Sequence, residues 1–101
     1  MESLLALSFD QLALGGLCRR YGICRLAVFG SALRGALGRE SDLDILVEFE
    51  PGIAVGLRFI TLQAELSDLF GRRVDLVTAG FLSPHFRPRV VQEAVPLYEA
   101  A

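Results

Sequence analysis

One segment, residues 43–49, most constrains how this chain can fold, because it is rich in apolar residues, carries acids at its start and is closed by Pro51-Gly52. Such a segment predicts a β-strand, in which Leu43, Ile45 and Val47 project to one face for apolar packing. Asp42 and Asp44, at the start of the segment, then project together from the other face. Two neighbouring carboxylates repel one another, so one of them takes up a proton unless a cation offsets the charge. The segment therefore predicts a sheet with an acidic site at the edge of its core.

Two further apolar segments, 24–29 and 73–78, are also expected to be strands. Helices are expected before, between and after these strands, over about 12–20, 33–37 and 55–70, with a last helical region from 83 to 96. This order predicts an α/β domain with at least three strands and helices packed on them.

The ends of the expected helices carry local signals. Ser8-Phe9-Asp10-Gln11 resembles a capping box that begins the first helix, and Gly22 ends it. Gly71 is expected to end the helix over 55–70. Pro88 is expected to break or kink the last helical region, because proline cannot donate a backbone hydrogen bond to the preceding turn. Pro96 is expected to end it.

Length and composition limit the classes of protein to consider. Residues 1–101 are expected to form a single domain. Because 52% of the residues are hydrophobic, we expect either a sheet that is buried on both faces or a surface that a partner covers. The net charge of −2 predicts no direct binding to nucleic acid. No apolar run is long enough to span a membrane, and the first residues lack the positive charge of a signal peptide. We therefore expect a cytoplasmic protein.

A third acid, Asp75, lies between apolar neighbours in the segment 73–78. If this strand pairs beside the strand of Asp42 and Asp44, the three carboxylates form one site. Carboxylates, waters and substrate phosphates are the oxygen ligands with which proteins hold Mg²⁺, and three such acids can hold two ions for phosphoryl transfer. The alternative is that Asp75 is a charge that protects an edge strand from aggregation, and that the other two acids cap a strand end.

Gly30-Ser31 stands where a strand ends and a short helix is expected to begin. Unpaired backbone N–H groups at such a position attract phosphate, glycine permits close approach, and the Ser31 hydroxyl adds a donor. Arg34, one helical turn later, can reach the same phosphates. As alternatives, Gly-Ser can be a simple turn and Arg34 a solvated surface residue.

Taken together, these residues resemble the signature of the DNA polymerase beta-like nucleotidyltransferases. Gly30-Ser31-x-x-Arg34-Gly35, followed by Ser41-Asp42-Leu43-Asp44, is similar to the string of the minimal (MNT) members, and the segment around Asp75 is similar to their third-carboxylate strand. The resemblance covers about residues 9–98. It implies a nucleotidyltransferase-like fold, in which helices pack on a small mixed sheet.

The resemblance also implies an activity and roles for individual residues. The activity is Mg²⁺-dependent transfer of a nucleoside monophosphate from a nucleotide triphosphate such as ATP, with two ions held by Asp42, Asp44 and Asp75. Asp75 would also help deprotonate the acceptor. Four residues are expected to bind the nucleotide: Gly30, Ser31, Arg34 and Ser41.

The acceptor is expected to be another protein, because few residues follow Asp75 to enclose a small substrate. In the antitoxins that the chain resembles, AMP is transferred to a tyrosine hydroxyl of a partner, a HEPN-domain toxin. Two alternatives stay open. The chain can be an antitoxin that neutralises the toxin by binding alone, or a small-molecule nucleotidyltransferase that works as a homo-oligomer.

Overall fold

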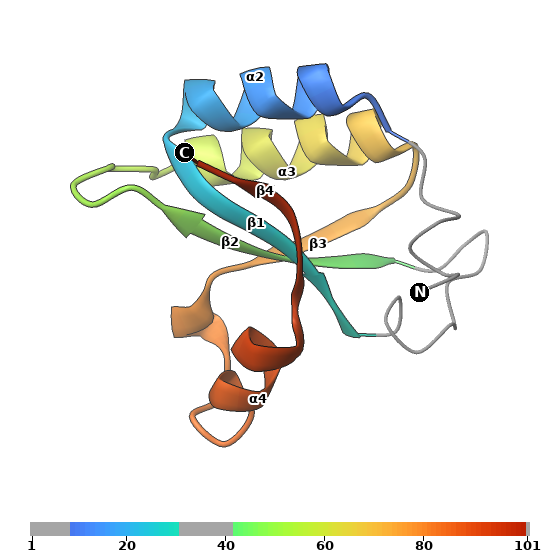
Figure 1. Ribbon diagram of the computed structural model, residues 1–101. Helices are drawn as coiled ribbons and strands as arrows, with labels where there is room; N and C mark the ends of the chain where they lie inside the picture. Colours follow the sequence, from blue (N-terminus) through green and yellow to red (C-terminus); the bar gives the residue numbers. More distant parts are fainter. Residues whose placement is uncertain (1–8, 31–41, 101) are drawn as a thin grey trace.

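A computed structural model of the protein describes residues 9–30 and 42–100, which form a mixed four-stranded sheet with helices on both faces (Figure 1). The elements in chain order are α2 (Gln11–Tyr21), β1 (Ile23–Phe29), β2 (Leu43–Phe49), α3 (Arg58–Phe70), β3 (Val74–Val77), the short 3-10 turn η2 (Ala79–Phe81), α4 (Arg87–Glu93) and β4 (Val95–Glu99). The strand order is β3-β2-β1-β4. Strand β1 is antiparallel to β2 and β4, whereas β2 and β3 are parallel. Within the described ranges, no helix is long and apolar enough to cross a membrane.

The main core lies between the sheet and the pair of helices α2 and α3, which run side by side over one face (Figure 1). Alternate residues of β2 enter this core, as the period-two pattern predicts. Leucine and other aliphatic side chains dominate it, and several are fully buried: Leu14, Leu26, Leu43, Ile45, Leu62 and Leu66. Much of the large apolar fraction of the sequence is buried in this layer.

The opposite face of the sheet carries a smaller cluster around Ala27, Leu46 and Ala94, and α4 and η2 lie on this side (Figure 1). Leu46 comes two residues after Asp44, and Val77, which packs against the same cluster, comes two residues after Asp75. Because residues two apart share a face, both acids project on the side of α4. The smaller cluster leaves the acid end of this face accessible.

The starts of two helices have local reasons, and one of them lies later than expected. Helix α2 begins at Gln11, because the side chain of Asp10 accepts hydrogen bonds from the N–H groups of Leu12 and Ala13 and so acts as the N-cap. Ser8, the expected cap, lies outside the described residues. Helix α3 begins at Arg58 rather than near 55, because Gly56 has a φ of +53°, which a right-handed helix does not accommodate.

The last helical region differs from the expectation at both of its prolines. Pro88 lies in the first turn of α4, where its missing N–H has no helical partner to lose, so the helix begins there and is not broken. Pro96 does not end a helix but lies within β4, a fourth strand that the sequence analysis missed. Strand β4 is at the edge of the sheet, where proline is tolerated.

Helix α3 also binds the outer edge of β3 through two side chains. The N–H of Val74 donates to Ser67 Oγ, and the N–H of Leu76 donates to Gln63 Oε1, both at 3.0 Å. Ser67 Oγ in turn donates to the carbonyl oxygen of Gln63 at 2.9 Å. Both neighbours of Asp75 are therefore anchored to a helix, which fixes the position of this acid along the sheet.

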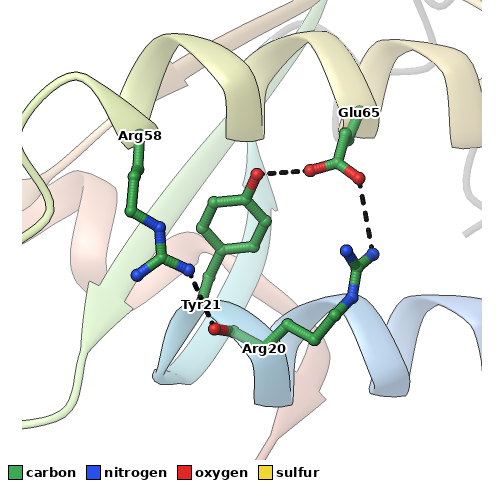
Figure 2. Close-up of polar contacts among 4 residues, drawn as sticks. All are labelled: Arg20, Tyr21, Arg58 and Glu65. Atoms are coloured by element: carbon green, nitrogen blue, oxygen red, sulfur yellow. Dashed lines mark hydrogen bonds and ion pairs between the residues drawn. The ribbon is translucent and has the colours of Figure 1, made fainter.

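A polar cluster links the ends of α2 and α3 (Figure 2). The Tyr21 hydroxyl donates to Glu65, which also pairs with Arg20 at 3.4 Å. Arg58 donates to the carbonyl oxygen of Arg20 at 3.0 Å, and its guanidinium lies 4.7 Å from the centre of the Tyr21 ring. The hydrogen bond and the charge of Glu65, together with burial, raise the pKa of Tyr21. This cluster joins the two helices on the side away from the acids.

Candidate active site

Asp44 and Asp75 are neighbours across the parallel pair of strands β2 and β3. Register partners in a sheet project to the same side, so the two carboxylates lie on the same face of the sheet. Asp44 is half-buried and Asp75 is exposed. The convergence expected from the strand period is therefore present for these two acids.

The electrostatics of Asp44 reflect this arrangement. Burial raises the pKa of the Asp44 carboxyl above its ordinary value, and the negative charges of Asp75 and then Asp42 raise it further. No Lys or Arg within the described ranges forms an ion pair with Asp44 or Asp75. Among the described residues, the negative charges of Asp44 and Asp75 are therefore not offset by an ion pair, which favours a bound cation.

Gly30 closes the site on the side of β1. Its neighbour Phe29 is the register partner of Asp44 in the antiparallel pair, so Gly30 lies directly beside the acid. It has a φ of +79°, and a Cβ at this position would overlap Asp44 Oδ2 and lie 3.2 Å from Asp44 Cγ. Only glycine permits both the backbone conformation and the close approach of the carboxylate.

Asp42 lies one step outside β2 and faces a basic residue. Its Oδ2 is 4.0 Å from Arg73 Nε, in an ion pair that is open to solvent. Within residues 9–30 and 42–100, no three His, Cys, Asp or Glu side chains are already gathered as metal ligands. Asp44 and Asp75 therefore form the centre of the site, and Asp42 stands at its margin beside Arg73.

Three of the expected nucleotide-binding residues, Ser31, Arg34 and Ser41, lie outside the described residues. Two other features of the site were missed in the sequence. One is the pairing of Arg73 with Asp42, and the other is the support of β3 by Gln63 and Ser67. The sequence signals for these two features were a basic residue directly before the strand that carries Asp75 and two polar residues four apart on α3.

The donor set suits a hard divalent cation. Carboxylate oxygens with open solvent beside them are the ligands that Mg²⁺ uses, since this ion keeps several waters and binds through one or two carboxylates. The raised pKa of Asp44 supports the same conclusion, because a bound cation relieves the repulsion that opposes its ionisation. The residues present therefore fit the ion that the sequence predicts.

Comparison with known proteins identifies the family. A model of the nucleotidyltransferase domain matches residues 12–98, which include the described acids and Gly30. The chain belongs to the nucleotidyltransferase domain family. The family assignment from the Gly30 and Asp42–Asp44 motif is thereby confirmed, and the chain is a nucleotidyltransferase by its membership of this family.

One curated relative is the protein adenylyltransferase MntA of Thermococcus cleftensis. It is 43% identical over 76 residues, which are 75% of this chain and 76% of the relative. A solved structure of a protein classed as a minimal nucleotidyltransferase has a TM-score of 0.71 and 44% identity, and the match covers 86% of this chain and 88% of that one. The expected nucleotidyltransferase-like fold is therefore confirmed.

Two solved toxin–antitoxin structures share the fold at lower identity. One, a toxin–antitoxin with AMP-PNP, has a TM-score of 0.69 and 24% identity, and the match covers 90% of this chain and 74% of that one. The other, the toxin–antitoxin MntA-HepT, has a TM-score of 0.60 and 21% identity, with coverage of 89% and 70%. At these identities the likeness extends to the fold alone.

Proposed function

We propose that this nucleotidyltransferase is an antitoxin that transfers AMP from ATP to a tyrosine hydroxyl of a HEPN-domain toxin. The observation that carries the proposal is the pair Asp44 and Asp75, held side by side next to Gly30, with no ion pair to either acid among residues 9–30 and 42–100. The relative from Thermococcus cleftensis, named a protein adenylyltransferase, supports AMP as the group and a protein as the acceptor.

Asp44, Asp75 and Asp42 would hold Mg²⁺, two ions in the full site. When bound, Mg²⁺ neutralises phosphate charge and stabilises the attacking and leaving oxygens. Asp75 is exposed and can receive an acceptor that arrives from outside the chain. In the transfer, the acceptor oxygen bonds to the α-phosphorus, the bond to the bridging oxygen breaks, and pyrophosphate leaves. The proton of the hydroxyl passes to Asp75 or to solvent beside it.

The nucleotide is assigned to the end of β1. The Gly30 backbone lies against the Asp44 carboxylate with no side chain between them, so backbone groups at the end of β1 can approach a phosphate bound near the acids. Ser31, Arg34 and Ser41 are proposed to bind the triphosphate through hydroxyl and guanidinium donors. ATP as the nucleotide agrees with the AMP-PNP in a solved toxin–antitoxin of the same fold.

A protein is proposed as the acceptor because several side chains of this chain are exposed to solvent. Asp75 is exposed, and two large apolar side chains, Phe81 on η2 and Phe86 before α4, are 73% and 63% exposed. A protein acceptor can cover such a surface while it presents its hydroxyl. The toxin–antitoxin MntA-HepT, which shares the fold, supports a toxin in this role.

Intact-mass spectrometry tests the proposal directly. The chain, ATP–Mg²⁺ and a HEPN-domain toxin are mixed, and the mass of AMP is expected on the toxin at a tyrosine. Asp44→Asn should abolish the transfer and leave the complex intact. Asp68→Asn removes the same charge from the exposed face of α3 and should transfer normally.

Two outcomes would favour the alternatives. If Asp44→Asn still protects cells from the toxin in full, neutralisation occurs by binding and the transfer is dispensable. If the chain alone modifies a free sugar or antibiotic efficiently, the acceptor is a small molecule and the protein acceptor is wrong.

A further inference from the structure

The structure holds Arg73 and Asp42 together through the backbone. The N–H of Leu43 donates to the carbonyl oxygen of Arg73 at 2.9 Å, and Leu43 is the register partner of Val74. Arg73 and Asp42 are therefore the next pair down the parallel ladder, one residue before each strand. Arg73 cannot move away from the acid site without unpairing β2 from β3.

The side chains, in contrast, are free to separate. Arg73 is 83% exposed and Asp42 is 49% exposed, and their closest atoms are 4.0 Å apart. Ion pairs this open to water contribute little to folding and exchange readily. Asp42 can thus leave Arg73 for a stronger cationic partner at little cost to the fold.

The site requires such an exchange before Asp42 can act as a ligand. Asp44 and Asp75 have no ion-pair partner in the described part of the chain, whereas Asp42 already faces a guanidinium. We propose that Arg73 is a positioning residue that acts through Asp42, a resident counter-ion that a divalent cation must displace. This inference rests on the proposed metal site and adds a competitor to it.

Displacement has a second consequence for Arg73. Once Asp42 turns toward the cation, the bond between Leu43 and the Arg73 carbonyl still holds the Arg73 backbone beside the site, so the guanidinium stays within reach of it. The guanidinium is then no longer paired with Asp42 and remains as a positive charge near the bound cation. Arg73 thus makes the pairing of charges in the site depend on whether a cation is bound, and this competition lowers the affinity of the site for a free cation.

Mn²⁺ binding to the full chain without nucleotide, followed by electron paramagnetic resonance, measures the competition. Arg73→Gln keeps a polar side chain and removes the charge, so Mn²⁺ should bind about two- to fivefold more tightly. Arg73→Lys keeps the charge and should bind like the wild type. Arg89→Gln removes the same charge from α4, where Arg89 pairs with Glu93, and should leave the affinity unchanged.

A second readout follows the guanidinium itself. In the wild type, Mg²⁺ should shift the Arg73 Nε–H resonance, and in Asp42→Asn that shift should be absent. Equal Mn²⁺ affinity in Arg73→Gln and the wild type would overturn the inference, as would weaker binding in the variant. A wild type that binds no Mn²⁺ at millimolar concentration would overturn the metal site as well, so the two failures are distinguishable.

Discussion

Replacing Gly30 by alanine separates backbone strain from damage to the site, because the chain contains a matched glycine. Gly30 and Gly52 have nearly the same positive φ, +79° and +84°, so a side chain imposes similar strain at both. At Gly52 an added Cβ meets nothing within 4 Å, whereas at Gly30 it overlaps Asp44 Oδ2. Only Gly30→Ala therefore has to turn the carboxylate of Asp44 aside.

The expected magnitudes differ accordingly. A left-handed conformation costs a residue with a Cβ about 1–2 kcal/mol, which lowers Tm by roughly 4–16 °C in a domain of this size. Both Gly30→Ala and Gly52→Ala should show this loss in thermal unfolding. A misplacement of about 1 Å at a reacting group costs about 100-fold in rate, so Gly30→Ala should also lose at least about tenfold in AMP transfer.

The rate of AMP addition, followed by intact mass at a temperature where all three proteins are folded, is the deciding assay. Gly52→Ala should transfer at the wild-type rate. The close approach of Gly30 to Asp44 would have no catalytic meaning if Gly30→Ala kept that rate, or if both variants slowed equally.

Three further changes test other parts of the structure. Because the pKa of Asp44 is raised in the folded state, its contribution to stability is present below the ordinary pKa of aspartate and is lost as the pH rises through the raised pKa. Asn cannot ionise, so the Tm of Asp44→Asn should rise relative to the Tm of the wild type between acid and neutral pH. Gln63→Leu should speed hydrogen exchange at the Leu76 amide and slow AMP transfer, whereas Gln63→Glu, which keeps an acceptor, should restore both. Tyr21→Phe removes the hydrogen bond to Glu65 and should lower the free energy of unfolding by about 0.5–1.5 kcal/mol without changing the rate of transfer.

The sequence predicted the elements whose signals are local. Strand β2 has the bounds that its period-two pattern predicts, and α2 and α3 end at Gly22 and Gly71, both with positive φ. Strand β4 was missed because Pro96 is a strong local stop signal, and only its place at the sheet edge makes it compatible with a strand.

The candidate site was predictable in composition but not in pairing. The spacing of the acids along each strand placed them on one face. That Asp44 lies opposite Asp75, however, depends on the parallel register of β2 and β3, which no single segment specifies. The ion pair of Arg73 with Asp42 depends on the same register, one step further along, so a slip of one residue would have broken both.

The bonds from α3 to β3 also bear on how the protein behaves in a crowded solution. An edge strand with free N–H groups is a template on which another chain can add a strand and begin aggregation. In β3 the outward N–H groups of Val74 and Leu76 are already occupied by Ser67 and Gln63. The strand that carries Asp75 is thus closed to intermolecular strand pairing, and a protein that approaches these acids must do so over the face of the sheet and not along this edge.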